Sequence, residues 1–241
     1  MSTIVVDHAQ DRYKSGAYNA EFGDDRWKAL QIQRLLLPHV RLQGLRSYAD
    51  IGCGNGGVLA NLVQGLRDHG APLGRAVGYD IAPIQDTAAL DQQGIVFRQA
   101  DFLDTEDTYD LITLNDVIEH VTEPTRFLTA LSDRAKYLAL HIPLDDRLSV
   151  HLTNQYNYRL QSVGHLSFWN ASSAINLLTG AGLTPLACRF TPGFLAPSGR
   201  QRPLQIAALP MRWLLWTISP CIASKTLGGV SLAVICRGRL G

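Results

Sequence analysis

Short apolar runs alternate with stretches of helical periodicity over most of the chain. Each run has the length of a strand and is bounded by polar or turn-forming residues, which is typical of buried β-structure. The predicted strands cover residues 47–51, 75–79, 95–100, 110–114, 137–142, 183–190 and 230–236. Strands that alternate with helices predict an α/β fold with a mostly parallel sheet covered on both faces.

Apolar residues at helical spacing predict the helices of this alternation. The predicted helices begin near Arg26, cover 57–66, 87–92 and 124–131, and follow Asn170. Asp24 or Asp25 can cap the first helix, and Asn170 can cap the last. Gly180 suits a left-handed end of that last helix.

The chain has 241 residues and shows no internal repeat. This length is enough for one sizeable core, so we expect a single domain over 1–241. Its parts are an N-terminal arm and helix (1–45), a core of alternating strands and helices (46–190), an insertion or lid (191–228), and a last strand and tail (229–241). The insertion is too long for a plain hairpin loop, and such segments often carry specificity.

Composition excludes several classes of protein. Hydrophobic residues make up 46% of the chain and charged residues 18%, which excludes whole-chain disorder and fibrous architectures. The four cysteines are widely spaced, which favours a reducing compartment, and the first twelve residues contain no apolar leader. We therefore expect a cytoplasmic protein.

Charge is distributed unevenly along the chain. All 21 acidic residues lie in 1–146, whereas 147–241 holds nine basic residues and no acidic one. Either this basic half packs against an acidic body, or it meets an anionic partner such as a phosphorylated substrate or a membrane surface. The net charge of only +1 and the lack of a basic–aromatic motif predict no nucleic-acid partner.

A glycine-rich turn carries the most specific chemistry. Residues 49–57 read Ala-Asp-Ile-Gly-Cys-Gly-Asn-Gly-Gly, after a predicted strand and before a predicted helix. That context is typical of a nucleotide-binding turn, where glycines let a ligand approach the backbone. Gly52, Gly54 and Gly57 also satisfy the G-x-G-x-x-G pattern of dinucleotide-binding proteins.

Aspartates at successive strand ends favour a different ligand. Asp50 precedes the glycine turn, where a carboxylate would repel a pyrophosphate and attract a cation. Asp80 and Asp101 end the next two strands. In a parallel sheet these ends face one crevice, so we expect Asp80 to accept ribose hydroxyls and Asp101 with Phe102 to contact an adenine. The implied ligand has an adenosine and a positively charged part.

These segments resemble the motifs of one enzyme family. Residues 50–56, 77–81 and 100–102 resemble the glycine motif, the second-strand acidic motif and the adenine-contacting segment of class I S-adenosylmethionine-dependent methyltransferases. Residues 109–121 and 164–168 resemble the ubiquinone-biosynthesis-like, small-molecule branch of that family. The resemblance spans about 47–192, and it departs from the family after the fifth strand and in the length of 191–228.

The resemblance implies a fold, a cofactor and a site. It implies a Rossmann-like, doubly wound sheet of seven strands, mostly parallel, with the last strand antiparallel. It also implies methyl transfer from S-adenosyl-L-methionine to a small-molecule acceptor, with a hydroxyl of a quinone precursor, glycan or specialised metabolite as the expected acceptor. The residues expected to line the cofactor are Asp50, Gly52, Cys53, Gly54, Asn55, Gly56, Asp80, Ile81, Asp101, Phe102 and Asn115.

Histidines are the candidate general bases for a hydroxyl acceptor. His141 lies near the end of a predicted strand, where its side chain could reach the crevice, and His120 follows the fourth strand. Each could instead be a structural histidine that bonds to the backbone, as could His165. No local pair among the three has the spacing of metal ligands, so we expect no metal site.

Three further possibilities follow from the sequence. The glycine pattern also permits an NAD(P)-dependent oxidoreductase, and the lack of an evident base permits a non-catalytic partner that binds the cofactor. The most apolar window, 204–223, contains Arg212 and two prolines, which argue against a membrane span. It suits a lid over the substrate or a peripheral membrane contact.

Overall fold

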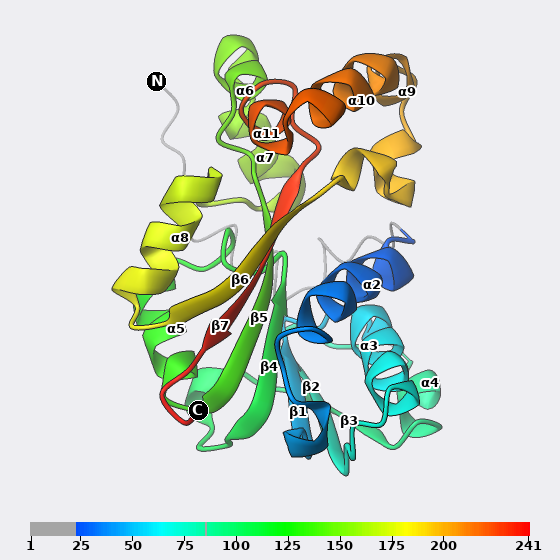
Figure 1. Ribbon diagram of the computed structural model, residues 1–241, viewed down its shortest axis with the longest axis vertical. Helices are drawn as coiled ribbons and strands as arrows, with labels where there is room; N and C mark the ends of the chain where they lie inside the picture. Colours follow the sequence, from blue (N-terminus) through cyan, green and yellow to red (C-terminus); the bar gives the residue numbers. More distant parts are fainter. Residues whose placement is uncertain (1–22, 85) are drawn as a thin grey trace.

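The computed structural model describes residues 23–84 and 86–241, which form a seven-stranded sheet between two layers of helices (Figure 1). The strand order across the sheet is β3-β2-β1-β4-β5-β7-β6. The strands are β1 Ser47–Ile51, β2 Arg75–Asp80, β3 Ile95–Gln99, β4 Tyr109–Asn115, β5 Ala135–Pro143, β6 Thr184–Thr191 and β7 Ser231–Arg237. Each lies within two residues of its predicted range.

Only β7 runs against the other described strands: β5 and β6 both pair with it in antiparallel register, and the remaining pairs are parallel. This arrangement confirms the predicted Rossmann-like sheet with an antiparallel last strand. The order reverses beside β1, which pairs with both β2 and β4. In such sheets the carboxyl ends of the strands flanking the reversal form the ligand crevice.

Helices cover the two faces of the sheet in separate layers (Figure 1). One layer holds α2 Asp25–Leu36, α3 Gly57–Asp68 and α4 Ala88–Asp91. The other holds α5 Pro124–Ser132 and α8 Ala171–Gly180. Short 3-10 turns lie at Leu42–Gly44 and Phe102–Asp104. The helices α2, α3, α4, α5 and α8 are the ones that the periodicity predicts.

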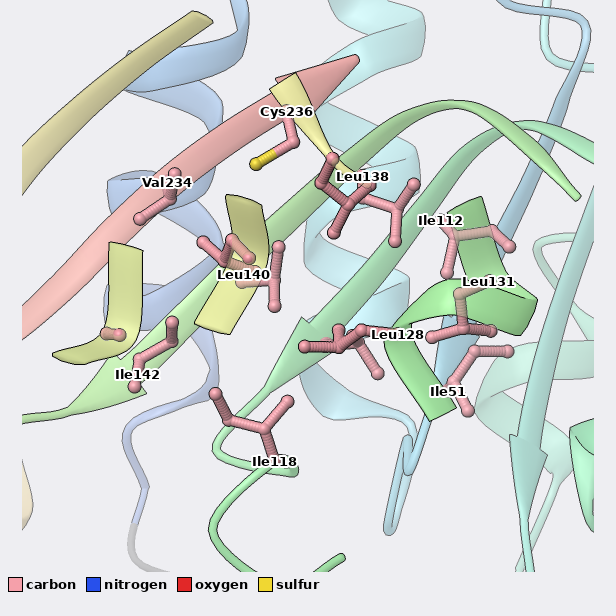
Figure 2. Close-up of a cluster of buried hydrophobic side chains, with 14 of the residues drawn as sticks. Ile51, Ile112, Ile118, Leu128, Leu131, Leu138, Leu140, Ile142, Val234 and Cys236 are labelled. Atoms are coloured by element: carbon pink, nitrogen blue, oxygen red, sulfur yellow. The ribbon is translucent and has the colours of Figure 1, made fainter. Parts of the chain in front are cut away.

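Each layer encloses its own hydrophobic core. Ile112 and Leu140 belong to the core under α5, together with Leu128 of that helix (Figure 2). Leu111, one residue before Ile112, belongs to the core on the opposite face with Leu62 of α3. Neighbouring residues of a strand point to opposite faces, so burial of both faces explains the unbroken apolar runs in the sequence.

A group of short helices extends beyond the carboxyl ends of β5 and β6 (Figure 1). Helices α6 Leu148–Thr153 and α7 Tyr156–Val163 follow β5. Between β6 and β7 lie 3-10 turns at Gly193–Leu195 and Pro197–Arg200, then α9 Pro203–Ala207, α10 Leu209–Ile218 and α11 Pro220–Lys225. The sequence predicts an insertion here but not its helices.

Two local predictions are wrong in detail. The carboxylate of Asp24 does not cap α2 but accepts hydrogen bonds from the backbone N–H and the hydroxyl of Ser198, which ties α2 to the segment after β6. The left-handed residue after α8 is Gly182, at φ 83°, and not Gly180. Asn170 caps α8 as predicted, since its side chain accepts from the N–H of Ser173.

Candidate functional site

The glycine turn connects β1 to α3 and requires glycine at two positions for packing. Gly52 and Gly56 have positive φ angles of 69° and 76°. A Cβ on Gly52 would lie 2.7 Å from Cγ2 of Val117, and one on Gly56 would lie 2.7 Å from Cδ1 of Leu90. Any side chain at either position would therefore strain the backbone and displace a neighbour.

Gly54 differs from these two glycines because it faces open space. Its φ is 53°, and no atom lies within 4 Å of where its Cβ would be. Its N–H donates to Oδ2 of Asp80 at 2.7 Å, and the N–H of Ala82 donates to Oδ1 at 2.9 Å. A carboxylate has about four acceptor positions, so Asp80 can accept two further hydrogen bonds beside the open face of Gly54.

Asp50 lies beneath the turn in a buried polar network. Its Oδ1 accepts from the hydroxyl of Thr113 at 2.5 Å and from Nδ2 of Asn115 at 3.1 Å. Oδ1 of Asn115 is buried and has no partner among the described residues. Burial raises the pKa of Asp50 to about 7, although both hydrogen bonds favour its charged form. The network therefore provides a buried carboxylate and an unused acceptor, which suits a cationic donor group.

The residues expected around an adenine divide into exposed and buried ones. Ile81 is exposed directly after Asp80, and Asp101 is exposed and caps the following turn through the N–H of Leu103. Phe102, by contrast, is buried in the core, where its ring lies edge-on to Tyr79 with centroids 5.1 Å apart. The ring of Phe102 is thus not presented to the crevice, contrary to the sequence-based expectation, and Ile81 is the exposed apolar surface there.

Two further expected cofactor residues, Cys53 and Asn55, lie on the glycine turn between β1 and α3. Cys53 is buried, and its Sγ is packed so close to Gly78 that a Cβ there would lie 2.7 Å from it. Only the backbone of Cys53 is therefore placed for a ligand. Asn55 is exposed at the tip of the turn.

His141 is buried and engaged at both ring nitrogens. Its Nδ1 lies 2.8 Å from Oδ1 of Asp116, and its Nε2 lies 3.0 Å from the hydroxyl of Thr191. The edge of its ring meets Trp27 of α2 at a centroid distance of 5.9 Å. The strand end was expected to direct His141 into the crevice, but α2 covers it. Both ring nitrogens of His141 therefore face protein partners, and the ring is not open to solvent.

Asp116 is a residue that the sequence analysis did not select. It adopts a left-handed conformation at φ 56° directly after β4, and Nζ of Lys28 lies 2.8 Å from its Oδ2. Burial favours the neutral form, but Lys28 and His141 together hold the pKa of Asp116 well below its usual range. Nothing in the local sequence indicates this ion pair, because Lys28 lies 88 positions earlier in the chain.

His120 lies in a compact cluster with Glu119 and His165. Its Nδ1 lies 3.1 Å from the carbonyl oxygen of Gly164, and its ring meets that of His165 edge-on at 4.9 Å. Burial, with the adjacent His165 contributing, lowers the pKa of His120 to about 4. Burial and the charges of Asp116 and Asp145 raise the pKa of Glu119 well above its usual range. The contact with Gly164 links His120 to the 164–170 loop.

Most of the predicted N-terminal arm lies outside the described residues, which begin at residue 23. Within the described part of the chain, no helix is long and apolar enough to cross a membrane.

A family comparison agrees with this geometry. A family model described as a methyltransferase domain matches residues 23–187. The match includes the glycine turn, β1 to β5 and the Glu119 cluster. The chain therefore belongs to this family and to the class I S-adenosylmethionine-dependent methyltransferases, which confirms the class predicted from its sequence. No curated protein matches the chain.

Solved structures share the fold at low sequence identity. Magnesium protoporphyrin IX methyltransferase from Synechocystis PCC 6803, with bound SAH, is 15% identical at a TM-score of 0.61, over 97% of this chain and 99% of that one. The N-methyltransferase NodS from Bradyrhizobium japonicum WM9, also with SAH, is 16% identical at a TM-score of 0.58, over 97% and 98%. A putative methyltransferase complexed with the Haloferax volcanii Trm112 activator is 13% identical at a TM-score of 0.58, over 97% of both chains.

Proposed function

We propose that this chain binds S-adenosylmethionine in the crevice at the carboxyl ends of β1, β2 and β4 and transfers its methyl group to a small-molecule acceptor. The observation that carries the proposal is the buried pair of Asp50 and Asn115, which leaves an amide oxygen without a partner beside a carboxylate. A cationic group with N–H donors would satisfy both. The methionine ammonium of the cofactor is such a group.

Asp80 and Gly54 would hold the nucleoside. Asp80 is fixed in place by two backbone N–H groups and retains acceptor capacity for two ribose hydroxyls. The open side of Gly54 allows the ligand to approach the backbone closely. Ile81 would cover one face of the adenine, and the exposed Asp101, two residues after β3, would contact the same base.

The bound cofactor supplies an electrophilic methyl group on a sulfonium. The chain then has to align the acceptor with that methyl group and exclude water. Asp116 is preorganised for positioning by Lys28 and His141, because both partners hold it ionised in one orientation. We infer that His141 and His120 act by supporting this edge of the site and not as the base.

The proposed acceptor is a small molecule with a hydroxyl, as the resemblance to the ubiquinone-biosynthesis-like branch implies. Two structural neighbours support the small-molecule part of the proposal, since one is a magnesium protoporphyrin IX methyltransferase and the other is the N-methyltransferase NodS. The segment 191–228, with α9 to α11, would select the acceptor as a lid. A nicotinamide cofactor is disfavoured because Asp50, in its ionised form, would repel a pyrophosphate.

We also propose that α9 and α10 contact an anionic membrane surface peripherally, so that a lipid-attached acceptor could reach the site. Large apolar side chains are exposed on these helices, namely Leu204, Ile206, Met211, Trp213, Leu214 and Ile218. Exposed Arg200, Arg202 and Lys225 lie in the same segment, which contains no acidic residue. Apolar anchors with basic neighbours are the pattern of interfacial helices.

Methyl transfer is tested by incubating the full chain with methyl-labelled S-adenosylmethionine and extracts containing phenols, glycans and quinone precursors. We expect label in an organic-soluble small molecule and equimolar S-adenosylhomocysteine. Tight cofactor binding with no transfer to any acceptor would support the non-catalytic alternative, in which the chain acts with a partner protein. One fold neighbour was solved with an activator protein. The small molecules should therefore come from a protein-depleted lysate, which supplies acceptors without any activator protein.

A further inference from the structure

Glu119, His120 and His165 form a cluster that the chain assembles from two distant segments. Glu119 and His120 follow β4, whereas His165 lies in the loop between α7 and α8. One carboxylate oxygen and one ring nitrogen from each histidine all lie within 4.8 Å of one another. Donors at about 2.1 Å from one tetrahedral ion lie roughly 3.4 Å apart, so binding would draw these side chains together by up to about 1.4 Å.

Glu119 is the second observation that points to a ligand. Its side chain is only 1% exposed, yet neither carboxylate oxygen accepts a hydrogen bond from another described residue. A buried carboxylate without partners is costly, because its charge has lost water and gained nothing in return. Asp116 and Asp145 add negative charge near Glu119. The ion pairs of Lys28 are with Asp116, and those of Arg147 and Arg159 are with Asp145.

The two histidines have neighbours of the kind that support metal ligands. The carbonyl of Gly164 can only accept, so Nδ1 of His120 carries the proton and the neutral ring has its lone pair at Nε2, 3.8 Å from Oε1 of Glu119. Nδ1 of His165 lies 3.3 Å from Oδ2 of Asp145, close enough for an ion pair although the two atoms make no hydrogen bond here. A carbonyl or carboxylate beside the second nitrogen is the usual support of a ligating histidine.

The backbone fixes the two segments against each other. The N–H groups of Leu166 and Ser167 both donate to the carbonyl oxygen of Glu119, at 2.7 and 3.0 Å. These bonds hold the His165 loop beside the turn that carries Glu119 and His120. The cluster is therefore built into the fold and is not an accident of mobile surface side chains.

We propose that Glu119, His120 and His165 bind one divalent first-row transition-metal ion. Two imidazoles and one carboxylate suit Zn²⁺, Co²⁺, Fe²⁺ or Mn²⁺ and are a poor set for Ca²⁺, which takes oxygen ligands. Three protein ligands leave at least one position open, as in catalytic and not structural zinc sites. Spacing along the sequence cannot reveal this set, because His165 lies 45 positions after His120.

The bound ion would activate the acceptor hydroxyl for methyl transfer, a role that rests on the proposed function. Glu119 follows Asn115 of the cofactor crevice by four residues, and this use requires that an acceptor hydroxyl reach the ion beside that crevice. A divalent ion lowers the pKa of a hydroxyl that coordinates to it, and the released proton passes to water. Such an ion would replace the missing protein base.

Metal binding is tested on the full-length protein after removal of metal with a chelator. Co²⁺ is titrated while its visible d–d absorption is recorded, and bound metal is counted by elemental analysis after dialysis against Zn²⁺ or Mn²⁺. The variants are Glu119→Gln, His120→Ala and His165→Ala. The control is His151→Ala, an exposed histidine that also pairs with a carboxylate, Asp146, but lies outside the cluster. Circular dichroism verifies that each variant is folded.

We expect one ion per wild-type chain and unchanged binding by the control. In each cluster variant we expect the metal affinity to be weaker by at least about 100-fold. Glu119→Gln is isosteric and removes a buried charge, so it should fold even where a histidine variant does not. Absence of stoichiometric metal in the wild type, or wild-type affinity in folded Glu119→Gln, would overturn the inference. S-adenosylhomocysteine is titrated into the same stripped sample: its binding without metal binding refutes this inference alone, and metal binding without it refutes the proposed cofactor site alone.

Discussion

The backbone N–H of Gly54 donates a 2.7 Å hydrogen bond to Oδ2 of Asp80. This bond joins the glycine turn after β1 to the end of β2, so the backbone and carboxylate proposed to hold a nucleoside form one rigid unit. Because Asp80 has both a structural bond and proposed ligand bonds, variants must separate the two roles.

Asp80→Asn should weaken binding of S-adenosylhomocysteine by about 100-fold, since charged acceptors make hydrogen bonds worth about 1.5–3 kcal/mol each. The asparagine oxygen can still accept from one backbone N–H, so the fold should persist. Calorimetric titration measures the affinity, and thermal unfolding verifies the fold. Asp68→Asn, an exposed change on α3, is the control. Equal affinities for the two variants would refute the ribose role of Asp80.

Gly54→Ala and Gly52→Ala should have different consequences. A methyl group at Gly54 meets only open space, so we expect Gly54→Ala to lose about 1 kcal/mol of unfolding free energy, because of the positive φ. We expect its loss of ligand affinity to be larger than that of Gly52→Ala. A methyl group at Gly52 meets Val117 at 2.7 Å and should destabilise the protein more. Urea unfolding and ligand titration on both variants check this contrast, and a reversed order would contradict the placement of the ligand over Gly54.

Cofactor affinity should depend on pH through Asp50. Its pKa is about 7 in the ligand-free protein, and a cationic ligand favours the ionised carboxylate. Binding should therefore release a proton below pH 7, and affinity should fall by up to about tenfold per pH unit between pH 7 and 5. In Asp50→Asn this dependence should be absent. Calorimetry in buffers of different ionisation enthalpy measures the released proton directly.

The same pKa has an opposite consequence for stability. The pKa of Asp50 is raised above its usual value in the folded state, so protonation of Asp50 stabilises the fold at low pH. This contribution is lost as pH rises through about 7. The unfolding free energy of the wild type should thus fall relative to that of Asp50→Asn from pH 4 to pH 8. A flat difference would mean that Asp50 is not buried as described.

His141→Ala should act on stability. It removes the partner of Thr191 and one of the partners of Asp116, so we expect a loss of about 2–3 kcal/mol in unfolding free energy. Thr191→Val should lose about 1 kcal/mol, and the double variant less than the sum because the two residues share one bond. Unchanged stability together with abolished methyl transfer would instead identify His141 as the base.

The membrane proposal predicts vesicle binding that depends on α10. The Trp213→Ser/Leu214→Ser variant should lose most of its co-sedimentation with vesicles containing anionic lipid, since both side chains are exposed anchors. Val96→Ser, which removes an exposed apolar side chain on β3, should bind like wild type. No binding of the wild type to anionic vesicles at low salt would refute the proposed contact.

The sheet could be predicted because its strands are buried on both faces. Leu111 and Ile112 point to opposite cores, so β4 reads as an unbroken apolar run bounded by polar residues. The cap of α8 was also readable, since Asn170 acts on a residue only three positions away. Local signals of this kind survive in the sequence. By contrast, α7 has no buried residue and therefore left no apolar periodicity to detect.

The site could be predicted only where its residues lie at strand ends. Asp50, Asp80 and Asn115 follow from a parallel sheet, because topology brings these ends together. The orientation of His141 does not follow, since a strand end does not reveal that α2 covers it. The pairing of Lys28 with Asp116 and the assembly of Glu119 with His165 depend on contacts between distant segments.

The most direct test of the account is calorimetric titration of the purified protein with S-adenosylhomocysteine, with NAD and NADP titrated in parallel. The account predicts one site per chain for S-adenosylhomocysteine, lost in Asp80→Asn, and no binding of either nicotinamide cofactor. Binding of NAD or NADP alone would contradict the account, because it would place a pyrophosphate beside the buried Asp50.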